Sequence, residues 1–280
     1  GQPLEAADAY QQSLAMGAFS KAPVIQLIGI YSARRDWPSA IQYLDQLIAL
    51  EEGADKKARY AMNIAVIYRD ELSDVDNAVV YLNRVLDLNI AQLEAFQAID
   101  ALLTHHKAWK PLEQNYRKMI ERVQRAGADF KQGPPLLFQL YRNLGEIYRT
   151  RMHKPEYAAS AFGLAIGLRP EDASVREILA ELYLQVDGEK DKAIEQHRWL
   201  IAHQPDRFDS YHRLVEVFES TGRHDQAWCT AALLRTLGKA TPEQLNFYDT
   251  YASPTVIEPT TRIDDRAWFR WLMPEGMDPY

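Results

Sequence analysis

The sequence has few of the features that would assign it directly to a class of protein. Its 280 residues include a single cysteine, Cys229, so no disulfide can form within the chain. Basic residues number 32 against 39 acidic ones, a net charge of −7. Binding to phosphate backbones relies on an excess of Lys and Arg, so we expect no nucleic-acid partner. No apolar run approaches the roughly 20 residues needed to span a bilayer, so no membrane insertion is expected.

The low cysteine content gives an indication of the cellular compartment. Cys229 lies between Trp228 and Ala231 in a helical pattern, which favours a buried or half-buried structural thiol. Low cysteine usage fits a reducing compartment, and we expect a cytoplasmic location. The first residues, GQPLEAADAYQQSL, lack a basic region followed by an apolar core. Because the sequence begins abruptly, a signal removed from it or lying upstream is the alternative.

Local catalytic motifs are also missing. The sequence has no phosphate-binding glycine loop, no HExxH and no GxSxG. The adjacent His105 and His106 would point about 100° apart on a helix, which favours a solvated pair over a metal site. His197 stands at a core-facing position and is expected to be a hydrogen-bonded structural residue, and Asp264 and Asp265 are expected to be solvated. We therefore expect a chain without catalytic residues, cofactor or metal.

What the sequence does contain is a repeat of roughly 34 residues. Small side chains recur at that period, and mostly apolar residues follow them after four and seven positions, which is the stripe of a buried helix face. The recurring positions are Ala6, Ala40, Ala78, Leu112, Ala158, Ala193 and Ala227. The residues four positions later are Tyr10, Leu44, Leu82, Tyr116, Phe162, His197 and Ala231.

Every unit except the N-terminal one contains a second apolar stripe, which lies before the stripe that begins with the small residue. A mostly aromatic position lies nine or ten residues before the small one, and Leu or Ile lies four residues before that. The aromatic series is Tyr31, Tyr68, Leu103, Tyr148, Tyr183 and Phe218. Segments such as SARRDWPS and QVDGEKDK separate the stripes and are rich in turn and cap residues. Each unit is therefore predicted to be a pair of helices.

A unit of this length, with Leu-Gly-x-x-Tyr in one helix and Ala and Phe in the next, resembles the tetratricopeptide repeat. The best match comprises Leu144, Gly145, Tyr148, Ala158, Phe162, Ala165 and Pro170. The resemblance covers about residues 1–240 and implies an all-α, right-handed superhelical solenoid of about six and a half repeats. Small residues would allow the helices to cross closely. Asp100 and Leu112 depart from the pattern, so the unit at 93–126 is the least regular.

The repeat divides the chain into four parts. We expect a half repeat, a second helix from Leu4 to Ala15 without a partner before it, and three units over 1–126. An inter-repeat loop follows at 127–135, because Gly127, Gly133 and two prolines do not continue a helix comfortably. This loop is a surface insertion or a hinge that contacts a partner. Three further units span 136–240, and a capping helix with an aromatic tail spans 241–280.

The tail contains three large aromatic residues, Trp268, Phe269 and Trp271. Large aromatic side chains are costly to leave in water, so we expect them to pack on the last repeat or to bind another molecule. The arrangement resembles the repeat region of large multidomain bacterial proteins, and we expect the chain to be a fragment of a longer protein.

The family resemblance also suggests binding residues. In the family, the first helices of the units line a concave face, where ligands bind. The corresponding residues here are Arg142, Asn143, Glu146, Arg149, Asn63, Arg69 and Arg213. An Asn amide can hold a peptide backbone, and Arg can bind a carboxylate through two parallel hydrogen bonds. The set is similar to the carboxylate clamp of chaperone-binding members, but an irregular unit separates Asn63 from Asn143.

These observations favour a non-enzymatic scaffold that binds a protein segment on its concave face, with Arg142, Asn143 and Arg149 as anchors. One alternative is the regulatory or substrate-docking region of an enzyme whose catalytic domain lies outside this chain. Another is self-association, through Trp268, Phe269 and Trp271 or through the uncapped first helix.

Overall fold

The computed structural model describes residues 2–15 and 21–251, with side chains for 6–12 and 21–251. Within these ranges the chain forms fourteen α-helices and no strand. The predicted all-α repeat fold is confirmed. No helix in the described ranges is long and apolar enough to cross a membrane. The predicted aromatic tail, with Trp268, Phe269 and Trp271, lies outside the described residues.

The helices follow one another as hairpins, each with a first and a second helix. The first helices are α2 (Lys21–Ala33), α4 (Ala54–Val66), α6 (Leu93–His105), α8 (Gly133–Glu146), α10 (Ala173–Gln185) and α12 (Phe208–Ser220). The second helices are α3 (Trp37–Leu50), α5 (Val75–Leu88), α7 (Trp109–Ala126), α9 (Pro155–Leu168), α11 (Lys190–His203) and α13 (His224–Thr236). A single helix flanks the hairpins at each end, α1 (Gln2–Ala15) and α14 (Pro242–Tyr251).

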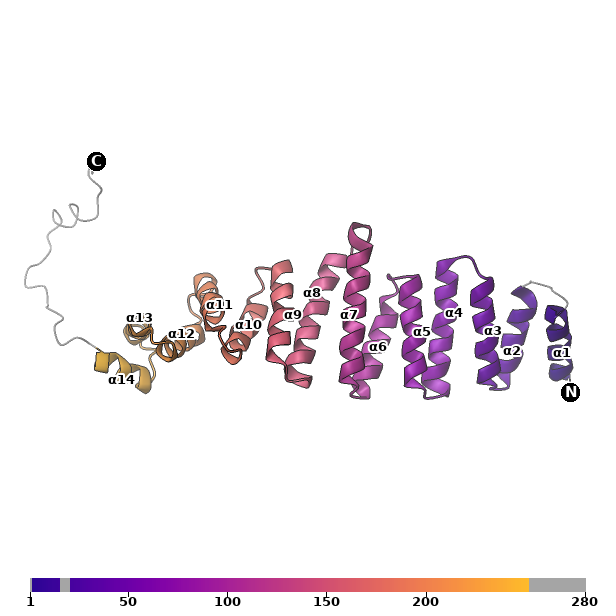
Figure 1. Cartoon of the computed structure of the whole chain (residues 1–280), viewed down its shortest axis with the longest axis horizontal. Helices are drawn as coiled ribbons and strands as arrows, with labels where there is room; N and C mark the ends of the chain where they lie inside the picture. The colour runs from indigo at the N-terminus through magenta and orange to yellow at the C-terminus, as the bar shows by residue number, and fades with distance from the viewer. Residues whose placement is uncertain (1, 16–20, 252–280) are drawn as a thin grey trace, which may run out of the picture. The chain divides into compact units, whose positions relative to one another are not determined.

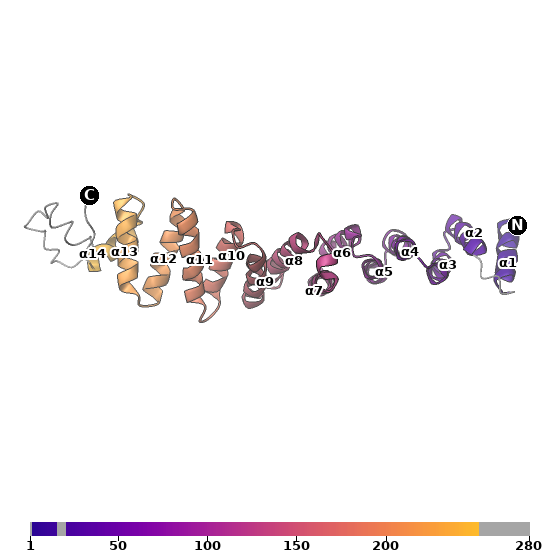
Figure 2. The same cartoon turned by 90° about the horizontal axis from the view of Figure 1, so that it is seen from above.

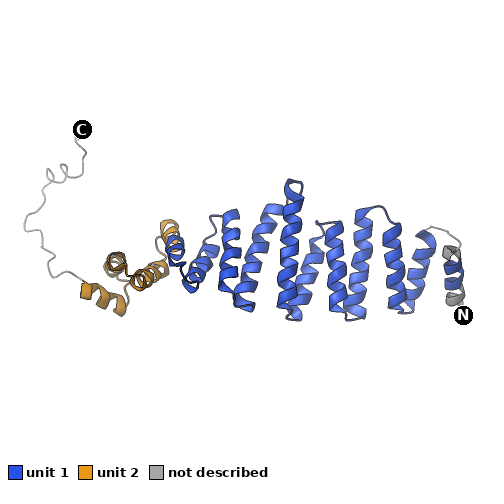
Figure 3. Cartoon of the chain, viewed as in Figure 1, with its two compact units in different colours: residues 1–196 blue, residues 197–280 orange. Residues whose placement is uncertain are grey.

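The chain divides into two compact units, residues 1–196 and 197–280, with the division inside α11 (Figure 3). In the first unit the helices stand side by side (Figure 1). From above, α2, α4, α6 and α8 form one row, and α3, α5, α7 and α9 form the other (Figure 2). In the second unit α12 packs on α13, and α13 packs on α14. Its core contains Val215, Ala231 and Leu234.

The predicted core positions are largely those that the structure buries. Ala40, Ala78, Ala158, Ala193 and Ala227 are each 0% exposed. The first helix is the exception, because Ala7 is 1% exposed whereas the predicted Ala6 is only half-buried. The alignment of this helix was wrong by one residue. Its unit lacks a first helix within the sequence, so a single stripe had to set the register there.

Two other predictions need correction. Cys229 is exposed rather than buried, because α13 turns Ala227, Ala231 and Leu234 toward the core and a residue two positions from Ala227 faces the other way. The predicted loop at 127–135 is shorter than expected. After a short 3₁₀ turn, Gly127–Asp129, helix α8 already begins at Gly133 with proline in its first turn. Proline suits this position, where its missing N–H has no partner to lose.

The hairpin of α8 and α9 shows why the small residues matter. Gly145 is buried, and a Cβ atom placed on it would lie 2.7 to 3.0 Å from three ring atoms of Phe162. Phe162 is itself 0% exposed, so its ring has little room to move. The backbone of α8 therefore approaches the ring of α9 as closely as a glycine allows.

Replacing Gly145 with alanine is expected to lower the free energy of unfolding by about 1–3 kcal/mol, the usual cost of overpacking a well-filled core. Gly167 in α9 has no atom within 4 Å of an added Cβ, so Gly167→Ala is the matched control. Alanine there is expected to stabilise the helix by about 0.5–1 kcal/mol. Urea unfolding followed by circular dichroism measures both. A Gly145→Ala protein as stable as the Gly167→Ala protein would contradict the close crossing.

Candidate functional site

The predicted binding residues lie on first helices or on the turns that end them. Arg142, Asn143 and Glu146 are on α8, and Arg149 is in the π-helical turn that follows, η3 (Ile147–Arg151). These four residues are one local cluster. All are exposed except Glu146, which is half-buried. The cluster is therefore open to a partner.

The remaining predicted residues are elsewhere. Asn63 is on α4, and Arg69 is in a second π-helical turn, η1 (Ile67–Glu71). Helix α6 stands between α4 and α8 in the row, so the structure does not bring Asn63 and Asn143 together (Figure 1). Arg213 is on α12 in the second unit. Asn63 and Asn143 therefore do not form a clamp, which needs residues from neighbouring first helices.

Three of the four arginines in the predicted set are paired with a nearby carboxylate. Arg149 donates through Nη2 to Glu146 Oε2 at 2.8 Å, and Arg213 donates through Nη1 to Glu216 Oε2 at 2.9 Å. Arg69 holds Asp70 by two hydrogen bonds, of 2.6 and 2.8 Å. The bond from Arg69 is the main cause that lowers the pKa of Asp70. Such pairs orient the guanidinium groups on an exposed surface.

Asn143 takes part in a hydrogen-bond chain that the sequence did not predict. Its amide donates to the Tyr116 hydroxyl at 3.4 Å, and that hydroxyl donates to Asp100 Oδ1 at 2.8 Å. Burial, and next the bond to Asp100, raises the pKa of Tyr116. The chain links α6, α7 and α8. Asp100, which departs from the repeat pattern, is therefore the partner of Tyr116. The signal for this bond in the sequence was a polar residue at a position where the repeat has a small one.

The two π-helical turns are a second feature that sequence reasoning missed. Both begin with Ile-Tyr-Arg, and each places one predicted arginine, Arg69 or Arg149, as its third residue. The amide of Leu72 bonds the carbonyl of Ile67, and the amide of Met152 bonds that of Ile147, which is a five-residue step. These turns take up one extra residue before the second helix. π-helical turns are frequent at functional sites.

The second unit contains a hollow of about 560 Å³ between α12 and α14. Glu216, Glu219 and Glu243 contribute carboxylates to its lining, and Phe247 and Tyr251 contribute rings. Burial raises the pKa of Glu219. The hollow is thus acidic and partly aromatic.

The histidines singled out in the sequence have the expected surroundings. His105 and His106 are exposed, with ring centres 5.0 Å apart. His197 is 2% exposed, and its Nδ1 lies 3.3 Å from Ser210 Oγ, which confirms a structural, hydrogen-bonded residue. The described residues contain no group of three or more His, Cys, Asp or Glu side chains suited to a metal ion. Asp264 and Asp265 lie outside the described residues.

Comparison with known proteins identifies one of the repeats. Residues 26–58 match the family model described as tetratricopeptide repeat. No curated protein matches the chain. The chain is a helical-hairpin solenoid protein. The matched segment, residues 26–58, is a tetratricopeptide repeat, as the sequence pattern predicts. Repeats of this kind are typical of protein–protein interaction scaffolds.

Solved structures with a similar arrangement are distant. The C-terminal part of a repeat-containing protein from Cytophaga hutchinsonii is 12% identical with a TM-score of 0.42, covering 88% of this chain and 94% of that one. The Naa15/Naa10 complex bound to HypK-THB is 12% identical with a TM-score of 0.46, covering 87% of this chain and 35% of that one. Pseudomonas aeruginosa pilF is 18% identical with a TM-score of 0.36, covering 89% and 100%.

The pair of Arg69 and Asp70 gives a pH prediction. Because the pKa of Asp70 is lowered, its carboxylate stays ionised through the pH range in which an ordinary Asp is protonated, and the pair is lost only as the pH falls through the lowered value. In an NMR titration, Asp70 is expected to titrate below about 3.9, the unperturbed Asp value. The Arg69→Gln variant should return it toward that value. An unchanged titration in the variant would contradict the assignment of Arg69 as the cause.

Proposed function

We propose that the protein is a non-enzymatic scaffold that binds a segment of another protein on the exposed face of its first helices. The main binding residues are Arg142, Asn143 and Arg149. The single observation that supports this proposal most is the exposed cluster on α8 and the turn after it. In this cluster, hydrogen-bond donors suited to a peptide backbone and to a carboxylate lie within two helical turns.

Arg142 and Arg149 would contribute differently. Within the described part of the chain, Arg142 has no hydrogen bond or ion pair, so its guanidinium is available to a partner carboxylate. Arg149 is held by Glu146, at Nε and at Nη2, and is oriented before a partner arrives. Pre-orientation lowers the entropy cost of forming a new hydrogen bond. A partner carboxylate would bind Arg142 directly and would share Arg149 with Glu146.

Asn143 contributes a third group, its side-chain amide, whose hydrogen bond to Tyr116 is long enough for a partner to replace. Its bond to the Tyr116 hydroxyl is long, at 3.4 Å, whereas Tyr116 is anchored by its shorter bond to Asp100. The amide can therefore turn to a peptide carbonyl while Tyr116 keeps a partner. This supports recognition of a peptide backbone beside an acidic side chain or a terminal carboxylate.

The double variant Arg142→Glu, Arg149→Glu tests this proposal. Hydrogen bonds to charged groups contribute about 1.5–3 kcal/mol each, so losing both and adding repulsion should weaken binding at least about tenfold. The measurement is affinity capture from lysate of the source organism followed by mass spectrometry, and titration of the captured protein against both forms.

The matched control is Arg34→Glu with Arg35→Glu. It makes the same change in charge at two exposed residues of a turn outside the cluster. The control should capture the same protein as the native chain. If the double variant and the native chain bind that protein equally, the face of α8 is not the binding surface.

A further inference from the structure

The turns that join a first helix to its second helix lie along one edge of the first unit, the lower edge in Figure 1. Two neighbouring turns on this edge, α6–α7 and α8–α9, are basic. Residues 105–110 and 149–156 together contain five basic residues and one acidic residue, Glu156, a net charge of +4. They also contain three histidines. Positive charge is thus concentrated here in a chain whose net charge is −7.

The next hairpin turn on either side of this pair has the opposite charge. Residues 69–76, around the α4–α5 turn, contain one basic and four acidic residues, a net charge of −3. Residues 187–192, around the α10–α11 turn, contain two basic and three acidic residues, a net charge of −1. The positive region is therefore confined to two hairpins.

A ring contact joins the two basic turns. The guanidinium carbon of Arg151, in the α8–α9 turn, lies 5.0 Å from the centre of the Trp109 ring, at the start of α7. A cation–π contact of this kind holds a guanidinium over the face of an aromatic ring. The contact uses none of the N–H donors of Arg151, and such donors bind carboxylates through two parallel hydrogen bonds.

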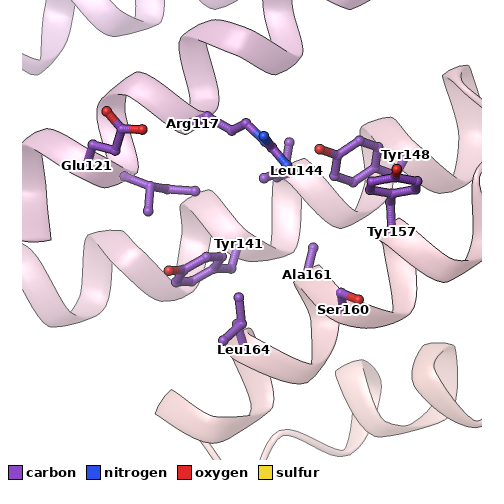
Figure 4. A pocket seen from close by; sticks show the side chains of 10 residues that line it. Arg117, Glu121, Tyr141, Leu144, Tyr148, Tyr157, Ser160, Ala161 and Leu164 are labelled. Atoms are coloured by element: carbon purple, nitrogen blue, oxygen red, sulfur yellow. The ribbon is translucent and has the colours of Figure 1, made fainter.

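Lys154 is positioned in the same way. Its Nζ lies 5.2 Å from the centre of the Tyr157 ring. Tyr157 packs beside Tyr148, with ring centres 5.4 Å apart, and both rings line the hollow drawn in Figure 4. The Tyr148 hydroxyl donates to the buried Glu113 at 2.6 Å. Lys154 therefore lies over a ring whose neighbour is anchored in the core.

Most cations of these turns are not neutralised by the chain itself. Within the described residues, four of the five basic side chains form no ion pair, and these are Lys107, Lys110, Arg151 and Lys154. Three of them are exposed, and Lys154 is half-buried. Glu113, in α7, is already held by Arg117. Glu146, in α8, is already held by Arg149. The four unpaired side chains, together with Trp109, are called the basic edge below.

The size of the basic edge favours a short segment over a large polyanion. Neighbouring helices pack ~8–10 Å apart, so the two turns together extend over roughly 20 Å. An extended segment of about six residues has this length, at ~3.3 Å per residue. A nucleic acid or an anionic bilayer is larger and would meet the acidic turns on both sides. A protein segment also agrees with the repeat, which is typical of protein–protein interaction scaffolds.

We propose that the basic edge binds a short, extended segment of a partner protein that is rich in Asp and Glu. Carboxylates of this segment pair with Arg151 in the α8–α9 turn and with Lys107 and Lys110 in the α6–α7 turn. The site is separate from the first-helix face, because it includes neither Arg142 nor Asn143.

The test uses the full chain and two labelled octapeptides, one of alternating Glu and Asp and the other of alternating Gln and Asn. Fluorescence anisotropy measures the dissociation constant of each peptide. The acidic peptide is expected to bind with an affinity that falls as salt rises, because salt screens exposed charges. The neutral peptide is expected to bind at least about tenfold more weakly, because it lacks the complementary charge.

Two double variants, one in each turn, locate the binding. Lys107→Glu with Lys110→Glu, and separately Arg151→Glu with Lys154→Glu, should each weaken binding of the acidic peptide at least about tenfold. The thermal midpoint of each variant checks that it is folded. The first variant removes no ion pair or ring contact of the described residues, so it decides the outcome even if losing the Arg151 contact destabilises the second.

The matched control is Lys56→Glu with Arg59→Glu. It makes the same change in charge at two exposed residues of α4, away from the turns. The control should bind the acidic peptide as the native chain does. A loss of binding in the control as large as in the turn variants would show that only the overall charge of the chain matters, and would contradict a site at the basic edge.

Other results would also overturn the proposal. They are absence of binding by the acidic peptide, equal affinity for the neutral peptide, and native affinity in the folded Lys107→Glu, Lys110→Glu protein. Tighter binding of a phosphatidylserine vesicle or of a single-stranded oligonucleotide, lost in both turn variants, would make a membrane or a nucleic acid the occupant instead.

The single variant Arg142→Glu separates this site from the first-helix face. It should leave binding of the acidic peptide unchanged. A loss of binding in Arg142→Glu, with native affinity in both turn variants, would place the acidic segment on the first-helix face and contradict the basic edge as its site. Native affinity in Arg142→Glu with weak binding in the turn variants would support the basic edge, whatever the first-helix face binds.

Discussion

The close packing of paired helices, tightest where α8 crosses α9, is the constraint on which the rest of the structure depends. At α8 and α9 it brings the Gly145 backbone onto the Phe162 ring, and the recurring alanines of the second helices, such as Ala158, are fully buried. A larger residue at these points would separate the helices and open the core. Because packing is fixed by so few inward positions, the outward positions are free to vary, and function can be carried by the surface.

The proposed binding surface uses the exposed face of α8 and the turn after it, where donors suit a carboxylate and a peptide backbone. It lies in residues 107–169, which carry 12 basic and 5 acidic residues and are the positive part of an acidic chain. We infer that this middle part attracts acidic partners, while the acidic remainder disfavours binding to nucleic acid or to a second acidic surface.

The helical hairpins could be predicted from the sequence because buried stripes recur with a fixed spacing, as at Ala158 and Phe162. The register of α1 could not, since Ala6 and Ala7 are chemically the same and a single stripe set the alignment. The π-helical turns were missed because one extra residue in a turn is usually absorbed by a longer loop. The candidate residues on α8 were placed by the repeat pattern, but the bond from Asn143 to Tyr116 depends on Asp100, which is 43 residues away in sequence. Contacts of this kind depend on how neighbouring repeats stack, and the contact of Arg151 with Trp109 likewise needed coordinates.

The most direct measurement is hydrogen–deuterium exchange of the full chain, alone and saturated with a captured partner. The account predicts slower exchange in peptides from residues 107–169, most of all in those that cover α8 and the turn after it, with little change in α2, α3, α12 and α13. Slower exchange confined to helices outside 107–169, with the middle of the chain unchanged in the complex, would contradict the claim that this part of the molecule binds its partners.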